Sequence, residues 1–154
     1  MHGMLKSVGG AMNKNVETIN LDNTAYEAAK KMRDRKVSSL VVVDGKNGRP
    51  AGIITERDLT RRVCAEGVSS RDVLVQKVMS APLVTIDPNS PVEVAADNMI
   101  HEKVRHLLVT DKDGKTLGII TPTDFGKVLS ERMDMDEVNS LILKAVQEES
   151  SYNS

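Results

Sequence analysis

The sequence predicts an α+β fold made of two pseudo-symmetric β-α-β-β-α repeats that pack as one module, with an amphipathic helix at the C-terminus. Three observations carry this prediction: an internal repeat, the same order of hydrophobic periods in both copies, and an apolar stripe near the C-terminus. The expected boundaries are residues 1–67 for the first repeat with its N-terminal segment, 68–133 for the second repeat, and 134–154 for the C-terminal helix and a frayed tail.

The internal repeat aligns the two halves over most of their length. Residues 12–42 share many identities with residues 79–109, and residues 52–55 (GIIT) recur as residues 118–121. The offset changes by one residue between these blocks, in a turn rich in Asp and Gly, where a change of length costs little. Copies of about 60 residues are too small for large independent cores, so we expect them to pack face to face.

Each copy reads as strand, helix, strand, strand and helix. The first helix has apolar residues at i, i+3, i+4 and i+7, and the next two strands flank a Gly-containing turn that is typical of a hairpin. The predicted elements of the first copy are a strand at 16–19, a helix with apolar positions 25, 28, 29 and 32, strands at 37–43 and 51–55, and a helix at 56–65 before Gly67. Those of the second copy are a strand at 83–86, a helix with apolar positions 92, 95, 96 and 99, strands at 104–110 and 117–121, and a helix at 123–133.

Capping residues indicate where the first helix of each copy begins. Thr24-x-x-Glu27 and Ser90-x-x-Glu93 match the capping-box pattern, in which each side chain accepts a hydrogen bond from the backbone N–H of the other residue. Pro91 stands at the first helical position, which suits proline. We therefore expect side-chain caps on both helices.

A linker at residues 68–72 separates the copies, and Ser70 or Asp72 is expected to cap a short helix that ends at Val78. After the second copy, acidic residues precede an apolar stripe at helical spacing, formed by Val138, Leu141, Ile142, Ala145 and Val146. Either the repeats or a second subunit must cover this stripe. We favour self-association, because the repeat pair is complete without the tail helix, and we expect residues 148–154 to fray.

Composition argues against several classes of function. The chain carries 21 Lys and Arg against 22 Asp and Glu, a net charge of -1, and 2% aromatic residues, so it lacks the basic surplus and the stacking side chains of a nucleic-acid-binding protein. No apolar run is long enough for a membrane span and the N-terminus has no signal-peptide pattern, so we expect a cytoplasmic protein. A local basic patch, which leaves RNA or DNA binding as a minor alternative, would comprise Arg57, Arg61, Arg62, Arg105 and Lys127.

The reactive side chains give little indication of catalysis, and we predict neither a catalytic site nor a metal site. Cys64 is the single cysteine, which excludes an internal disulfide, and its place in a predicted helix favours a packed, inert thiol. His101 and His106 have metal-type partners only by chance spacing. Residues 114–116 (GKT) match the last three residues of a phosphate-binding P-loop motif, but Val109 occupies the position where that motif requires its first glycine.

Residues 52–58 (GIITERD) and 118–124 (GIITPTD), with the segments that begin at Ala11 (AMNKNVET) and Val78 (VMSAPLVT), resemble the signature of the cystathionine β-synthase (CBS) domain, whose tandem pair is called a Bateman module. The resemblance covers residues 11–133. One such heptapeptide is weak evidence for the family, whereas two at matching offsets are strong evidence. The resemblance implies a module that binds AMP, ADP, ATP or S-adenosylmethionine in clefts between the copies and relays occupancy to a partner.

The chemistry of the motif suits such a ligand. Thr55 and Thr121 stand where a strand turns into a helix, so their hydroxyls and nearby N–H groups can face an anion. Asp58 and Asp124, one turn later, can each accept two hydrogen bonds from neighbouring ribose hydroxyls. The candidate adenine contacts are aliphatic and backbone groups of Thr18, Ile19, Thr85 and Ile86. The alternative is that Thr-x-x-Asp is only a capping box at a helix start.

The second copy is expected to supply the better phosphate contacts, which either cleft could use. Arg105 and His106 stand there in place of Ser38 and Ser39, and the resemblance implies that basic residues at these positions contact phosphate. The supplementary candidates are Arg57, Arg61 and Lys127. The alternative is that these residues are ordinary surface charges. Because Pro122 and Thr123 replace Glu56 and Arg57, we expect the two sites to differ in affinity or ligand preference.

We therefore predict a non-catalytic sensor of adenosine nucleotides. It needs no cofactor, takes AMP, ADP or ATP as a regulatory ligand that Mg2+ can accompany, forms a homodimer, acts on an effector protein, and contacts neither membrane nor nucleic acid. The alternative from another class is a ligand-free scaffold, in which the repeats and the tail helix only dimerise or dock a partner protein.

Overall fold

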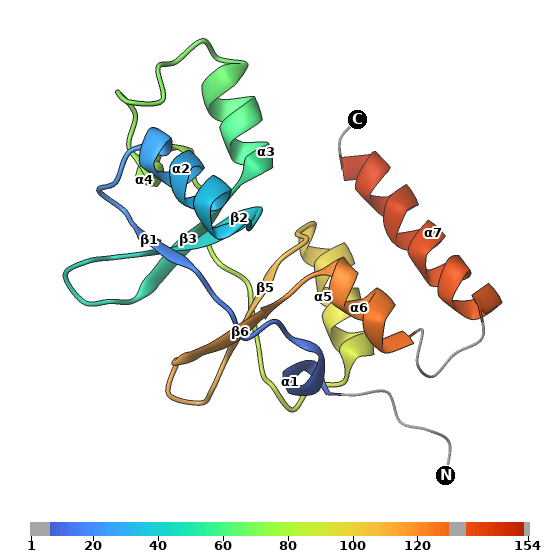
Figure 1. Ribbon diagram of the computed structural model, residues 1–154. Helices are drawn as coiled ribbons and strands as arrows, with labels where there is room; N and C mark the ends of the chain where they lie inside the picture. The colour runs from blue at the N-terminus through green and yellow to red at the C-terminus, as the bar shows by residue number, and fades with distance from the viewer. Residues whose placement is uncertain (1–6, 130–134, 153–154) are drawn as a thin grey trace. The chain divides into compact units, whose positions relative to one another are not determined.

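Two compact units make up the chain in the computed structural model, which describes residues 7–129 and 135–152 (Figure 1). One unit comprises residues 16–83, and the other combines residues 1–15 with residues 84–154. Each unit has its own three-stranded sheet and its own hydrophobic core. The predicted α+β class and the two β-α-β-β-α repeats are confirmed.

The first unit follows the predicted order of elements. It contains β1 (Thr18–Asn20), α2 (Ala25–Arg35), β2 (Ser39–Val43), β3 (Pro50–Thr55), α3 (Glu56–Leu59), a π-helical turn (Thr60–Cys64) and α4 (Val75–Val78). The strand order is β1-β2-β3, with β1 parallel to β2 and β2 antiparallel to β3. The apolar stripe of α2 is buried with alternate residues of the sheet, in a core that includes Ala25, Ala28, Met32, Leu40, Val42 and Ile54.

The second unit repeats this topology and adds a helix at each end. It contains α1 (Val8–Ala11), β4 (Thr85–Ile86), α5 (Val92–Glu102), β5 (Leu107–Thr110), β6 (Thr116–Ile120), α6 (Pro122–Leu129) and α7 (Met135–Tyr152). The strand order is β4-β5-β6, with β4 parallel to β5 and β5 antiparallel to β6. Its core includes Val8, Ile86, Ala95, Met99, Leu107, Val109 and Ile120. The short helix α1 was not predicted.

Two flanking segments each belong to the unit that does not follow them in the sequence. Residues 7–15 precede β1 but belong to the second unit, and residues 70–80 precede β4 but belong to the first unit. Asn13 and Ile119 exchange backbone hydrogen bonds of 2.8 and 3.0 Å, and Ile53 and Ser80 exchange bonds of 3.0 and 2.8 Å. These bonds pair the flanking segments with β6 and β3, which are the outer strands of their sheets. The compact units therefore differ from the predicted boundaries at residues 67 and 68, which followed the sequence repeat.

Helix capping is as predicted for α2 but not for α5. The Thr24 hydroxyl accepts from the Glu27 N–H, and a Glu27 carboxylate oxygen accepts from the Thr24 N–H, both at 3.1 Å. The predicted capping box at Ser90 is wrong, because Pro91 is the N-cap of α5 and no side chain caps this helix. The chain before α5 pairs with a flanking segment instead, where the Val8 N–H donates to the Ser90 carbonyl at 2.8 Å.

The predicted caps of α4 are also wrong. This helix begins at Val75 after Leu74, without a side-chain cap. Ser70 and Asp72 lie in the preceding loop, where the Ser70 carbonyl accepts a hydrogen bond of 3.0 Å from the Tyr26 N–H. The loop is thus fixed by backbone bonds to α2, which places Ser70 and Asp72 too early to cap α4.

Cys64 is exposed, so the expectation of a packed thiol is wrong. It ends the π-helical turn next to Val63, which is 2% exposed and part of the core. Successive side chains on a helix diverge by about 100°, so the residue after a buried Val63 points away from the core. Gly67 follows with a φ of 68°, a left-handed conformation that suits the predicted helix stop.

The C-terminal helix α7 is longer than predicted. It continues to Tyr152, so the predicted fraying is wrong for residues 148–152, and residues 153–154 lie outside the described part. Residues 130–133, the predicted end of the preceding helix, also lie outside it. The described residues leave the predicted apolar stripe uncovered, since Leu141, Ile142 and Val146 are 40%, 47% and 52% exposed. No helix in the described ranges has the length and apolar character that a membrane span requires.

Candidate functional site

The sheet of the first unit brings several candidate residues to one end. β1 and β2 are parallel, so Thr18 and Ser39, which begin them, lie at the same end of the sheet. β3 runs the opposite way and ends at Thr55, which pairs with Ser39. α3 starts there and carries Asp58. Because neighbouring strands are about 4.8 Å apart, these side chains form one group of potential ligand contacts.

The second unit gathers the corresponding residues at the equivalent end of its sheet. Thr85 begins β4, Arg105 and His106 precede β5, and Thr121 follows β6. Asp124 then lies in the first turn of α6. In each unit, the candidates for ribose, adenine and phosphate contacts are therefore placed together by topology, although they are far apart in the sequence.

The two motif glycines are required by the flanking segments. A Cβ atom at Gly52 would lie 2.7 Å from the Met79 sulfur and 2.7 Å from the Ser80 carbonyl oxygen. A Cβ atom at Gly118 would lie 2.6 Å from the Met12 sulfur. Such distances are shorter than any ordinary contact of a side chain, so only glycine fits. The methionine and the glycine that recur in both copies are thus two sides of one contact.

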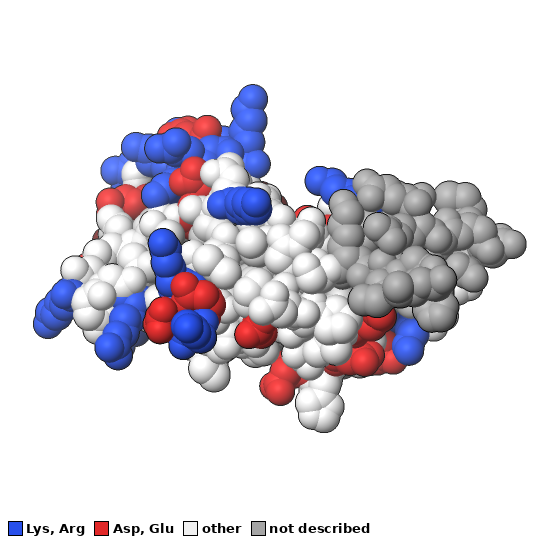
Figure 2. All heavy atoms as spheres, turned by 90° about the horizontal axis from the view of Figure 1, so that it is seen from below, with Lys and Arg blue, Asp and Glu red and all other residues white. Residues whose placement is uncertain are grey.

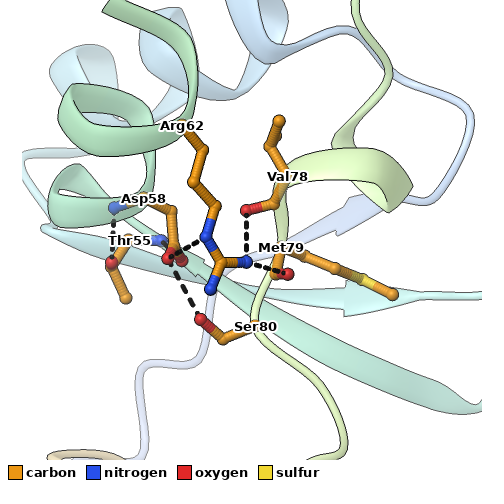
Figure 3. Close-up of polar contacts among 6 residues, drawn as sticks. All are labelled: Thr55, Asp58, Arg62, Val78, Met79 and Ser80. Atoms are coloured by element: carbon orange, nitrogen blue, oxygen red, sulfur yellow. Dashed lines mark hydrogen bonds and ion pairs between the residues drawn. The ribbon is translucent and has the colours of Figure 1, made fainter. Parts of the chain in front are cut away.

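Thr55 and Asp58 form a capping box at the start of α3 (Figure 3). The Thr55 hydroxyl accepts from the Asp58 N–H at 3.1 Å, and Asp58 Oδ2 accepts from the Thr55 N–H at 3.0 Å. The second carboxylate oxygen, Oδ1, accepts from the Ser80 hydroxyl at 3.0 Å and lies 3.9 Å from Arg62 Nε. Asp58 is 6% exposed. The protein therefore engages both oxygens of this carboxylate.

Thr121 and Asp124 make a related but less complete arrangement at the start of α6. Asp124 Oδ2 accepts from the Thr121 N–H at 2.8 Å and from the Thr121 hydroxyl at 3.2 Å. Asp124 is 9% exposed. Its Oδ1 forms no hydrogen bond or ion pair with the residues that the structure describes. Both carboxylates thus turn one oxygen to their own backbone, but only that of Asp124 keeps the other oxygen available.

The adenine candidates divide into exposed threonines and buried isoleucines. Thr18 and Thr85 are exposed. Ile19 and Ile86 are each 7% exposed and belong to the cores of their units. A ligand at these positions would meet backbone atoms and the threonine side chains more than the isoleucines.

A surface hollow of about 410 Å3 lies beside β1 in the first unit. It contains the adenine candidates Thr18 and Ile19 but neither Thr55 nor Asp58. The Lys31 ammonium donates a hydrogen bond to the Thr18 carbonyl at its edge. The lining residues are Thr18, Ile19, Asn20, Asn23, Glu27, Lys31 and Val43.

Arg105, one of the two phosphate candidates of the second unit, carries a charge and already has a counterion. Arg105 Nη1 lies 3.1 Å from a Glu149 carboxylate oxygen of α7, with 49% of the Arg105 side chain exposed. His106 is half-buried. In the first unit, Ser38 is exposed and Ser39 is half-buried. The supplementary candidates Arg57, Arg61 and Lys127 are all exposed.

Arg62, Ser80 and Glu149 contact the site but were not assigned to it from the sequence. Arg62 stands four residues after Asp58, a spacing that brings side chains together on a helix and could have indicated the pair. The only sequence signal for Ser80 was its place directly after Met79, a methionine that recurs in both copies. Its contact with Asp58 depends on where the flanking segment docks, which the sequence does not show. Glu149 had no local signal.

The described residues also bear on two other kinds of site, a metal site and a basic surface. They contain no group of three or more His, Cys, Asp or Glu side chains placed to hold a metal ion. Lys and Arg share the face drawn in Figure 2 with Asp and Glu, and uncharged residues lie between them. This mixed surface agrees with the balanced composition of the chain.

Comparison with known proteins gives consistent matches along the chain. The CBS domain profile matches twice, at residues 5–65 and 75–131. An uncharacterized protein of Methanopyrus kandleri is 37% identical over 122 residues, which are 79% of this chain and 62% of that protein. This chain thus spans less than two thirds of that relative.

Solved structures show the same fold. A conserved CBS domain protein of unknown function from Thermoplasma acidophilum has a TM-score of 0.76 and 27% identity, over 91% of this chain and 76% of that one. A CBS domain protein from Pyrobaculum aerophilum, solved in complex with AMP, has a TM-score of 0.71 and 20% identity, over 92% of this chain and 98% of that one. With both repeats matched by the profile, the chain belongs to the CBS domain family and carries a tandem pair of these domains.

Proposed function

We propose that this chain is a regulatory module that binds an adenosine-containing ligand, either AMP, ADP, ATP or S-adenosylmethionine, and has no catalytic activity of its own. The observation that carries the proposal is Asp124, a carboxylate more than nine-tenths buried that keeps one unpartnered oxygen at a sheet end where Arg105 and His106 also lie. A charged acceptor that lacks a protein partner favours a ligand with donor groups.

The roles proposed for individual residues follow from their chemistry. Asp124 accepts hydrogen bonds from the ribose hydroxyls, Arg105 pairs with phosphate through its planar guanidinium, and His106 adds charge near or below neutral pH. Adenine lies against backbone and threonine groups. The further candidates for ligand contacts are Thr85, Ile86 and Thr121 in the second unit, and Thr18, Ile19, Ser38, Ser39, Thr55 and Arg57 in the first.

AMP is the first ligand to test, because a protein of the same fold was solved with AMP bound. Mg2+ can accompany ADP or ATP, since it binds phosphate oxygens together with few protein groups. Occupancy would alter the affinity for an effector protein or for a second copy of the chain. Such coupling requires that the ligand bind one of two conformational states more tightly than the other.

The test is a melting-temperature series with AMP, ADP, ATP and S-adenosylmethionine, followed by calorimetric titration of any ligand that shifts the transition. A ligand at 100 times its dissociation constant adds about 2.7 kcal/mol to stability. Adenine and inorganic phosphate, tested separately, show whether the ribose is needed. If the double substitution Asp58→Asn with Asp124→Asn leaves every shift intact, the ribose assignment is wrong.

A second candidate function is a ligand-free scaffold that dimerises or docks a partner protein. The observation that favours it is the exposure of large apolar residues along α7, where Leu141, Ile142, Leu143 and Val146 are 40% to 60% exposed. Light scattering distinguishes the two readings when combined with the ligand series. A stable dimer that responds to none of the four ligands supports the scaffold, and Leu143→Glu should then dissociate it.

A further inference from the structure

We infer that the two equivalent motif carboxylates have different roles: Asp58 fastens a flanking segment to the first unit, and Asp124 alone takes the ribose, so that one nucleotide binds per chain. The role of Asp58 is independent of any ligand. The role of Asp124 rests on the proposed function and assigns it to one of the two copies.

The Asp58 cluster consists of Asp58, Arg62, Ser80 and the backbone of Val78 and Met79 (Figure 3). Arg62 Nη1 donates to the Met79 carbonyl at 2.7 Å and to the Val78 carbonyl at 3.3 Å. The same guanidinium approaches Asp58, whose Oδ1 also accepts from the Ser80 hydroxyl. Asp58 and Arg62 together therefore bind three consecutive residues of the flanking segment.

This arrangement occupies both oxygens of the Asp58 carboxylate, each with one hydrogen bond from the protein. A carboxylate has about four acceptor positions. One oxygen serves the Thr55 N–H, and the other serves the Ser80 hydroxyl with a cation beside it. A ribose diol would have to reach the remaining acceptor positions of a side chain that is 6% exposed, or displace these partners. The gain from two new hydrogen bonds would then be offset by the loss of the existing ones.

The sequence differences between the copies explain why Asp124 is not held in this way. The position equivalent to Arg62 is Val128, which cannot form an ion pair. The position equivalent to Ser80 is Asn13, whose side-chain oxygen instead accepts from the Asn15 N–H at 2.9 Å. The flanking segment of the second unit is thus paired through its backbone but makes no side-chain bond to Asp124.

The free oxygen of Asp124 is also accessible. Among the described residues, every fully buried side-chain nitrogen or oxygen has a hydrogen-bond partner. Oδ1 of Asp124 has none, so it must reach the surface even though the residue as a whole is 9% exposed. A recessed carboxylate with one open oxygen is suited to receive two neighbouring hydroxyl groups.

The ligand arm of the test uses AMP and two isosteric variants of the full chain. Calorimetric titration of the unsubstituted protein is expected to give one AMP per chain. Asp124→Asn should weaken AMP binding about 10- to 100-fold, because it removes a charged acceptor. Asp58→Asn, the matched control in the other copy, should change the affinity by less than about threefold.

The second arm measures melting temperatures without ligand. Asp58→Asn should lower the melting temperature by about 5 °C, whereas Asp124→Asn should change it by less than about 2 °C. Ser80→Ala should also lower it, and the double variant Asp58→Asn with Ser80→Ala should fall short of the sum of the single shifts, because the two residues share one bond. Circular dichroism confirms that each variant is folded.

The outcomes separate the two parts of the inference. Two AMP molecules per chain, or equal loss of affinity in both variants, would overturn the assignment to Asp124. Equal melting shifts for Asp58→Asn and Asp124→Asn, or strictly additive effects of Asp58→Asn and Ser80→Ala, would overturn the structural role of Asp58. Failure of the unsubstituted protein to bind any of the four adenosyl ligands would overturn the proposed function together with the role of Asp124, while the melting data would still decide the role of Asp58.

Discussion

The lack of a Cβ atom at Gly52 and Gly118 allows the flanking segments to lie close to β3 and β6. An added methyl group would meet the Met79 sulfur and the Ser80 carbonyl oxygen at Gly52, and the Met12 sulfur and the Asn13 carbonyl oxygen at Gly118. A methionine side chain can adjust, but the Ser80 carbonyl accepts a hydrogen bond of 3.0 Å from the Ile53 N–H and cannot move without losing it. The glycines are therefore structural requirements of the motif, apart from any ligand.

Gly52→Ala and Gly118→Ala are expected to lower the free energy of unfolding by about 1 to 3 kcal/mol each, through overpacking. Gly126→Ala is the control: it lies in α6 with no atom within 4 Å of an added Cβ, so it should raise stability by about 1 kcal/mol or less through helix propensity. Urea unfolding measures all three. A Gly52→Ala variant as stable as Gly126→Ala would show that the flanking segment is not tightly packed.

The capping box of α2 predicts a pH dependence. Hydrogen bonds from the Thr24 backbone, then from the Thr24 and Asn23 side chains, lower the pKa of Glu27 below its ordinary value of 4.5. Because the folded-state pKa is depressed, this contribution to stability is present above about pH 4.5 and is lost as the pH falls through the folded-state value. The melting temperatures of Glu27→Gln and the unsubstituted protein should therefore converge between pH 6 and pH 3. Glu93→Gln, at the predicted Ser90 box where no cap forms, should show no such convergence.

At the scale of elements, hydrophobic period was sufficient to predict helices and strands whose faces are buried within their own repeat. The stripes of α2 and α5 and the apolar runs of β2 and β5 were located correctly, except at Ala29, which is exposed, because local spacing determines their burial. Helix starts were less predictable. Ser90 fits a capping box by sequence, yet pairing of the preceding chain with residues 8–9 moves the cap to Pro91. A distant backbone contact overrode a local preference.

Contacts between distant segments also limited how much of the candidate site could be predicted from the sequence. The Thr-x-x-Asp residues and the basic residues before β5 were predicted because they recur or differ at aligned positions. The sequence could not show that Asp58 meets Ser80 or that Arg105 meets Glu149, because each contact depends on where a separate segment docks. These contacts determine which candidate remains available to a ligand.

The α7 helix supplies a counterion to Arg105, and under the proposed function this counterion would compete with the ligand's phosphate. Glu149→Gln removes the charge that pairs with Arg105, so AMP affinity is expected to increase about two- to fivefold, in line with a partly exposed ion pair. Glu148→Gln is the matched control, since it removes the same charge from the adjacent position. The difference between the variants should diminish at 0.5 M salt, where exposed ion pairs are screened. Equal affinities in both variants at low salt would contradict the competition.

On the scale of the whole molecule, each unit is completed by residues from outside its own repeat. Val8 and Val75 lie in the two flanking segments, and each is fully buried in the core of its unit. Val8→Ala should therefore increase hydrogen exchange in β5, β6 and α5 and leave α2, β2 and β3 unchanged, whereas Val75→Ala should do the reverse. Exchange measured by mass spectrometry resolves the two patterns. If Val8→Ala instead loosened residues 18–55, the assignment of the N-terminal segment would be wrong.

The placement of residues 7–15 also sets an order of events during protein synthesis. The first unit is one continuous stretch, so it can fold while the ribosome is still adding residues. Residues 7–15 emerge before the first unit, but β6, with which they pair, follows only after about a hundred further residues, or about 5 to 20 seconds of translation. During that interval residues 7–15 must remain unpaired, and the second unit can close only once residue 120 has been made.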